Sequence, residues 1–111
     1  METLAKGDVV LFPFPYTDLS DRKLRPCLVL SEEMSNDIIL CQITSQRLRK
    51  DEYSVELKQV DTIDGTLQID SYVRANMIFT ASKAQVHRKL CKVRDDKYRQ
   101  VTDAITRNIV K

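Results

Sequence analysis

Residues 27–43, CLVLSEEMSNDIILCQI, contain two apolar runs separated by a polar stretch. The first run spans residues 27–30 and the second spans residues 38–43, with MSND at residues 34–37 between them. Apolar runs of this length are typical of strands covered on both faces, and turn-forming residues between two such runs indicate a hairpin. The segment therefore predicts a β-hairpin of two buried central strands, around which the core is built.

The chain before this hairpin predicts one more strand and a loop. Residues 9–12, VVLF, form a short apolar run that is followed by Pro13 and Pro15. Proline lacks the N–H group that a strand ladder needs, so the two prolines favour a strand end or a sheet edge. Residues 16–25 are polar and rich in side chains that satisfy turn backbone, which favours a loop.

The chain after the hairpin continues with strand patterns. Tyr53, Val55 and Leu57 alternate with polar residues, which is the period of a half-buried strand. The DG pair at residues 64–65 is typical of a turn. Two later segments also favour strands, namely residues 67–69 and residues 73–79.

The last part of the chain has a different period. From Asp95 onward the apolar residues recur every three or four positions, which predicts an amphipathic helix with Asp95 as its N-cap. Five or more short strands followed by one helix predict a mainly β fold with a C-terminal helix. We expect a small antiparallel barrel, because closure removes the exposed edges of so small a sheet. The apolar positions of the helix are Tyr98, Val101, Ala104, Ile105 and Ile109.

The composition limits the domain count and the class of function. With 111 residues and 12.9 kDa, the chain has the size of a single domain over residues 1–111. Its only glycines, Gly7 and Gly65, are too far apart for the glycine-rich loop of a nucleotide site. Lys and Arg number 18 against 16 Asp and Glu, so any surface that binds nucleic acid must be local.

Targeting and redox features favour a cytoplasmic protein. No apolar run approaches the roughly 20 residues of a membrane-spanning helix, and residues 1–6 lack the apolar stretch of a signal peptide. Cys27, Cys41 and Cys91 lie far apart among apolar neighbours, as reduced buried thiols do. They do not form the closely spaced pairs of a structural zinc site. We therefore expect no cofactor, no metal and no membrane contact.

Charged side chains are the remaining candidates for chemistry. His87, the single histidine, lies in the basic pattern VHRKL without an acidic neighbour to orient its ring, which disfavours a role as general base. A cluster of basic residues by itself indicates a solvated rim, and three clusters on one face would be needed for a binding surface. The basic clusters are Arg22-Lys23-Arg25, Arg47-Arg49-Lys50 and Arg88-Lys89-Lys92-Arg94.

Several motifs together resemble the MazF/PemK family of toxin–antitoxin endoribonucleases. The resemblance covers roughly residues 7–94, and the C-terminal helix matches only in pattern. It implies an SH3-like barrel of the CcdB/MazF type, a homodimer, metal-independent cleavage of single-stranded RNA such as mRNA, and neutralisation by a cognate antitoxin. The motifs are GDVVLFPFPYTD at 7–18, RPCLVLS at 25–31, IILCQITS at 38–45, and Leu67 with SYVR at 71–74.

The resemblance also implies site residues. The family's catalytic arginine corresponds to Arg25, its catalytic threonine to Thr44, and the arginine of its Ser-x-Val-Arg motif to Arg74. RNA can be cut by its own 2′-hydroxyl, so an enzyme needs only to align that attack and to stabilise the charge that develops on the phosphoryl oxygens. A guanidinium fork and a hydroxyl suit this task. The residues expected to bind substrate are Tyr16, Arg22, Lys23, Ser45, Arg47, Ser71 and Asn76.

Two positions depart from the family pattern and leave alternatives open. Asn76 stands where many members carry an acidic residue, and an amide cannot exchange protons at neutral pH. Cys91 stands where the family often has glycine, and cysteine would be strained if φ were positive. One alternative is therefore a catalytically degenerate relative that only binds RNA or its antitoxin. Another is a non-enzymatic gyrase poison resembling CcdB, although that family uses a C-terminal tryptophan and this chain contains none.

Overall fold

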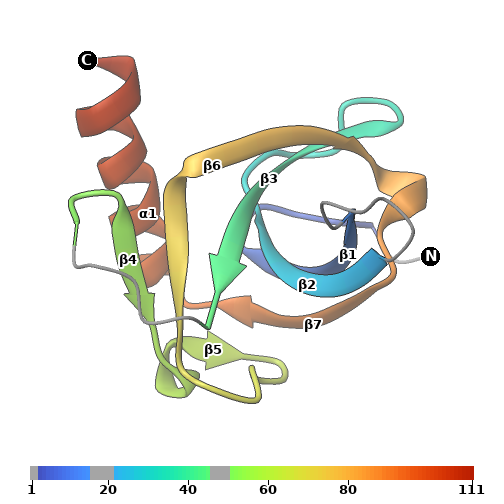
Figure 1. Cartoon of the computed structure of the whole chain (residues 1–111), viewed down its shortest axis with the longest axis horizontal. Helices are drawn as coiled ribbons and strands as arrows, with labels where there is room; N and C mark the ends of the chain where they lie inside the picture. The colour runs from blue at the N-terminus through green and yellow to red at the C-terminus, as the bar shows by residue number, and fades with distance from the viewer. Residues whose placement is uncertain (1–2, 16–21, 46–50) are drawn as a thin grey trace.

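The computed structural model describes residues 3–15, 22–45 and 51–111, which form a curled antiparallel sheet of seven strands and one C-terminal helix (Figure 1). The sheet order is β4-β6-β3-β2-β1-β7-β5. Short 3₁₀ turns precede β5 and β7, and a π turn extends the helix. The bounds are β1 Asp8–Pro15, β2 Arg22–Val29, β3 Asp37–Thr44, β4 Ser54–Leu57, η1 Gln59–Asp61, β5 Thr62–Ile63, β6 Ser71–Ser82, η2 Lys83–Gln85, β7 Arg88–Val93, α1 Asp95–Ile105 and η3 Thr106–Val110.

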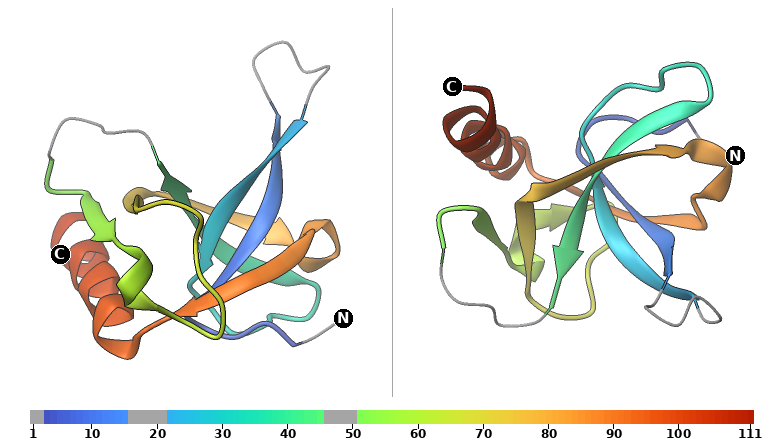
Figure 2. Two further views of the ribbon diagram at one scale, coloured as in Figure 1. Left: turned by 90° about the horizontal axis from the view of Figure 1, so that it is seen from below. Right: turned by 45° about the horizontal axis from the view of Figure 1, so that its top comes forward.

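The predicted fold class, mainly β with a C-terminal helix, is confirmed. The views in Figure 2 show a sheet that curls into a half-barrel, with α1 packed outside it beside β4 and β6. The edge strands β4 and β5 contain four and two residues, so little unpaired edge is exposed. The N-cap of α1 is Arg94, one residue before the predicted Asp95. Asp95 instead lies in the first turn of the helix, where the helix dipole favours an acidic side chain.

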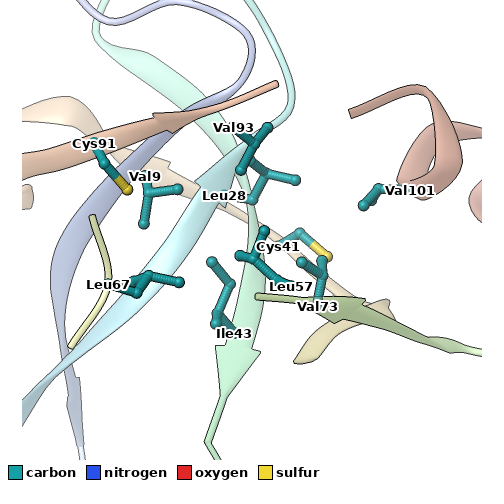
Figure 3. Packing of buried hydrophobic residues seen from close by; sticks show 10 residues of the cluster. All are labelled: Val9, Leu28, Cys41, Ile43, Leu57, Leu67, Val73, Cys91, Val93 and Val101. Carbon is teal, nitrogen blue, oxygen red and sulfur yellow. The ribbon is translucent and has the colours of Figure 1, made fainter. Parts of the chain in front are cut away.

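Two apolar clusters lie on the two faces of the sheet. Successive strand residues point to opposite faces, so Val9 and Leu28 join one cluster while Val10 and Cys27 join the other. Figure 3 shows the first cluster, in which side chains of the sheet meet Val101 of α1. The predicted hairpin of buried strands corresponds to β2 and β3, and its apolar side chains divide between both clusters.

The first strand is longer than the sequence indicates. Both prolines lie within β1, and the expected loop 16–25 is wrong for residues 22–25, which belong to β2. The reason is that Leu11 points its carbonyl toward the His87 N–H, at the last register position that β1 shares with β7. Pro13 and Pro15 therefore direct their missing N–H toward the same side, where the pairing with β7 has ended and no donor is needed.

Other strands differ from the expectation in the second half of the chain. Residues 67–69 are not a strand, whereas residues 73–79 lie inside β6 as predicted. No local pattern in the sequence predicts β7. This strand pairs with β1 through a bulge, in which Val9 faces Cys91 and Val10 faces Lys89, and a bulge disrupts the alternation that identifies a strand. Cys91 is buried and is not among the residues with positive φ, so the backbone strain considered for it does not occur.

The strands β2 and β3 pair over a short distance and then separate. Their register runs from Val29↔Leu40 to Cys27↔Gln42 and stops there. Below this point β2 continues alongside β1, while the end of β3 pairs with β6 through Thr44↔Tyr72. The sheet is therefore split between the first half of β2 and the last residues of β3, and the candidate site lies at this split.

Candidate functional site

The strand register brings Arg25 and Thr44 to the same face of the sheet. Cys27 lies opposite Gln42, and each candidate is two residues further along its strand, on the same face as those partners. The two strands no longer pair at this point, so Arg25 and Thr44 lie on the two sides of the split, each two residues beyond the last pair. Arg25 is half-buried and Thr44 is buried, and both make contacts with other groups. The site therefore has a cation on one side of the split and a hydroxyl on the other.

Arg74 reaches the same face from β6. Tyr72 lies opposite Thr44 and so shares its face, and Arg74 is two residues further along β6. Nη1 of Arg74 donates to Oδ2 of Asp51, which precedes β4, at 2.9 Å and to Oγ of Ser54, the first residue of β4, at 2.6 Å. The register thus assigns the three residues expected to be catalytic to the same face of the sheet, although they come from three strands.

The ion pair with Arg74 favours the charged form of Asp51. Their side chains are 17% and 33% exposed, and the second Asp51 oxygen accepts a hydrogen bond from the Tyr53 N–H. The hydrogen bond from Arg74 is the main reason why the pKa of the Asp51 carboxyl lies below its ordinary value. Sequence reasoning missed Asp51, because nothing in the sequence connects it with an arginine on a different strand.

We expect the substitution Asp51→Asn to change the acid sensitivity of the fold. Because the pKa of Asp51 is lowered in the folded state, its stabilising contribution is present above the ordinary carboxyl pKa and is lost as pH falls through the folded-state value. Urea unfolding should show wild type more stable than the variant at pH 7, by a small amount given the solvent exposure, with the difference vanishing at low pH. The charge-matched control is Asp103→Asn, on the exposed side of α1. A difference that is independent of pH would contradict this assignment.

The residues expected to bind substrate divide among several places. Lys23 lies opposite Phe14 on the face that carries Arg25 and is exposed. Arg22 is the first residue of β2, opposite Pro15. Ser45 and Ser71 line a cavity on the other face, and Asn76 is exposed on β6, within the irregular part of its pairing with β3. Tyr16 and Arg47 lie outside the described residues.

An aromatic cluster beside Arg25 is a feature that the sequence analysis did not identify. Phe12 lies directly opposite Arg25 across the β1–β2 pair. Its ring centroid is 5.6 Å from that of Phe14 and 5.4 Å from that of Phe79, and the latter two rings are 5.3 Å apart. Phe12 is buried and the other two are half-buried, so the cluster forms an apolar surface next to Arg25. In the sequence, Phe12 and Phe79 are only recognisable as residues of two predicted strands.

The three cysteines are buried thiols, as predicted. Burial raises the pKa of Cys41 to about 12 and that of Cys91 to about 11, and it raises the pKa of Cys27 as well. Since the thiolate is the reactive form of cysteine, these side chains are poor nucleophiles at neutral pH. The Cys41 thiol instead donates a hydrogen bond to the Arg74 carbonyl at 2.9 Å.

This burial predicts a simple chemical result. At pH 7.5 the native protein should resist iodoacetamide for hours, whereas protein unfolded in guanidinium chloride should gain three adducts, which mass spectrometry counts. A single thiol that reacts rapidly in the native protein would show that one cysteine is activated.

The remaining candidates have ordinary surroundings. His87 is exposed, just after the turn η2. Its backbone N–H, not its ring, donates to the Leu11 carbonyl. Within the described ranges, no three side chains of the His, Cys, Asp and Glu types are close enough to hold a metal ion together. None of the helices in those ranges has the length and apolar character that crossing a membrane requires.

Comparison with known proteins identifies similar sequences and folds. Residues 5–109 match a family model described as the PemK-like, MazF-like toxin of type II toxin–antitoxin systems. A comparison with curated proteins gives no significant match.

Solved structures with a similar fold include MazF from Deinococcus radiodurans, with a TM-score of 0.75, 19% identity and 100% of each chain covered. The MazE–MazF complex of the same organism gives 0.76 and 19%, over 96% of this chain and 95% of that one. An endoribonuclease from a mycobacterial species, solved with its cognate antitoxin, gives 0.72 and 17%, with coverages of 96% and 95%. These likenesses confirm the predicted barrel type.

Proposed function

Since the chain belongs to the PemK-like, MazF-like family of type II toxins, we propose that it is an endoribonuclease that cuts single-stranded RNA, such as mRNA, without a metal ion. The observation that supports this best is the common sheet face of Arg25, Thr44 and Arg74, which the register assigns from three strands. Two cations and a hydroxyl on one face are the groups that stabilise a phosphodiester as negative charge develops on it.

The proposed reaction uses the nucleophile that RNA itself carries. The ribose 2′-oxygen forms a bond to the adjacent phosphorus while the bond from phosphorus to the 5′-oxygen of the next nucleotide breaks. The 2′-hydroxyl loses a proton and the leaving oxygen gains one. Arg25 acts as the clamp on two phosphoryl oxygens, because a guanidinium stays charged and presents parallel donors. DNA lacks the 2′-hydroxyl and is not a substrate.

Thr44 and Arg74 complete the proposed site. The Thr44 hydroxyl, at the end of β3, donates to a phosphoryl or leaving oxygen. Arg74 serves as the second cation. Both of its contacts to Asp51 and Ser54 use Nη1, and among the described residues no other side chain holds Nε or Nη2, which are then available to an anion. Asp51 and Ser54 would thereby orient the guanidinium before substrate binds.

The test of this function is RNA cleavage in the presence of a chelator. The protein is incubated with a mixed-sequence RNA in EDTA, and the new ends are mapped. We expect discrete cuts in RNA, and no cuts in DNA of the same sequence. Intact RNA under all conditions would reject the proposal.

A binding-only protein remains the second candidate, because exposed Asn76 offers no acid at a position where many relatives have one. A gel shift without strand scission would favour that function. Inhibition of gyrase in a supercoiling assay would instead favour a CcdB-like poison.

We also propose a homodimer in the cytoplasm with a cognate antitoxin as its partner. Exposed apolar side chains occur on β6 and on η3, and the Asn108 side chain of η3 donates to the carbonyl of Glu52, in the turn that precedes β4. Because exposed apolar side chains are frequent at protein interfaces, we propose that β6 and η3 contribute to the dimer contact. Light scattering should give twice the chain mass of 12.9 kDa. The apolar side chains are Met77, Ile78, Ile109 and Val110.

A further inference from the structure

A cavity of about 280 Å³ lies at the split between β2 and β3, on the face opposite to Arg25. Leu24 and Pro26 line it, and they alternate with Arg25 along β2. The left view of Figure 2 shows the segment that joins β5 to β6 crossing over β7 on this side of the molecule. Residues 66–69 of that segment form part of the cavity wall. None of the residues proposed to be catalytic lines it.

The volume and the lining of the cavity are compatible with one nucleobase. Its volume is near the lower limit of about 300 Å³ for pockets that hold drug-sized ligands. Apolar side chains line it from the strands, with Leu11 on β1 and Leu90 on β7, and from the connecting segment, with Leu67 and Ile69. Unpaired nucleobases are commonly held between such surfaces, because every base has an apolar face.

Polar groups at the cavity indicate which edge of a base it can read. Arg88 is exposed at its rim and provides a guanidinium, and Gln68 provides an amide. The Ser71 hydroxyl donates to the Ile69 carbonyl at 3.0 Å, so its oxygen can only accept. Arginine donors pair best with the carbonyl oxygen of guanine or uracil. An apolar side chain of a bound peptide would form no hydrogen bonds with Arg88 or Gln68, whereas a base can.

The cavity is also adjacent to the proposed catalytic groups. Pro26 directly follows Arg25 and Ser45 directly follows Thr44, and both Pro26 and Ser45 line the cavity. The cavity and the proposed catalytic side chains therefore lie on opposite faces of the same two strands. A nucleotide whose phosphate contacts Arg25 and Thr44 at the split can therefore direct its base over the strand ends into the cavity.

We infer that this cavity is a base-specificity pocket, which takes an unpaired guanine or uracil next to the scissile phosphate and reads its carbonyl edge through Arg88. The inference rests on the proposed function. It names the site at which one position of the target sequence is selected, which family membership alone does not indicate.

The experiment compares cleavage-site preferences in an RNA pool with randomised flanks. Wild type should favour guanine or uracil at one position beside the cut. Arg88→Leu should lose roughly a tenfold preference or more at that position only, while the other positions keep theirs. The control Arg99→Leu removes the same charge from exposed α1 and should keep the wild-type pattern. If Arg88→Leu keeps the cleavage-site preferences of wild type, the cavity does not read a base, and the inference is wrong.

A binding measurement separates failure of the pocket from failure of the enzyme. Oligonucleotides with a 2′-deoxy group at every position cannot react by the proposed route, so competition between four such strands that differ in one base reports recognition alone. Discrimination by wild type but not by Arg88→Leu supports the pocket even if no RNA is ever cut. Equal binding of all four strands by wild type overturns it.

Discussion

Replacing Arg25 by alanine is expected to lower the RNA cleavage rate by about 10²–10³-fold while the protein stays folded. Arg25 is half-buried in the middle of β2, opposite Phe12, and belongs to neither apolar cluster, so its loss leaves both clusters in place. We expect the rate to fall because the guanidinium of Arg74 is held by Asp51 and Ser54 and does not replace that of Arg25. Single-turnover kinetics with an oligonucleotide cut at one position measure the effect.

Two further variants show whether the fork or the charge of Arg25 matters. Arg25→Lys keeps the charge but loses the bidentate geometry, so it should recover only part of the lost rate. Arg99→Ala removes an exposed arginine from α1 and should cleave like wild type. If Arg25→Ala cleaves at the wild-type rate while its thermal unfolding is unchanged, Arg25 is not the clamp.

The substitution Gly65→Ala is expected to cost about 2–5 kcal/mol of folding free energy. Gly65 has φ of +124°, which side chains with a Cβ rarely adopt. A Cβ at this position would also lie 2.2 Å from the Leu90 carbonyl oxygen and 3.2 Å from the Cys91 Cβ. The turn would have to move away from β7, and the adjoining wall of the base pocket would move with it. Urea unfolding measures the loss.

Gly7→Ala is the matched control for this prediction. Gly7 also has a positive φ, +92°, but a Cβ there would meet only side-chain atoms at 3.7 Å or more, which is ordinary contact. The control therefore measures the conformational cost alone, about 1–2 kcal/mol. Equal losses from the two substitutions would show that the close approach of Gly65 to Leu90 does not contribute.

Local patterns in the sequence were sufficient for the fold class. The apolar runs that became β2 and β3, the alternation around Val55 and the helical period after Asp95 each depend on neighbours within a few residues. The strands that the sequence did not predict depend on distant partners. Two-residue β5 exists only because it pairs with β7, and β7 has its alternation broken by the bulge opposite Val9 and Val10.

The site could be anticipated in part. Its candidates, Arg25, Thr44 and Arg74, came from a family resemblance, because no spacing in one chain reveals that separate strands share a face. The register of three strand pairs supplies that information. The partner of Arg74, namely Asp51, and the base pocket at Arg88 required the structure, since both join segments that are far apart in the sequence.

In the proposed reaction the 2′-hydroxyl of RNA is the nucleophile, and the protein supplies only alignment and charge stabilisation. The most direct measurement uses two oligonucleotides that differ by one 2′-deoxy group at the nucleotide whose 2′-oxygen would attack. The unmodified strand should be cut there to leave a 2′,3′-cyclic phosphate, and the deoxy strand should remain intact at that position. Cleavage of the deoxy strand at the same rate, leaving a 3′-hydroxyl, would contradict the account.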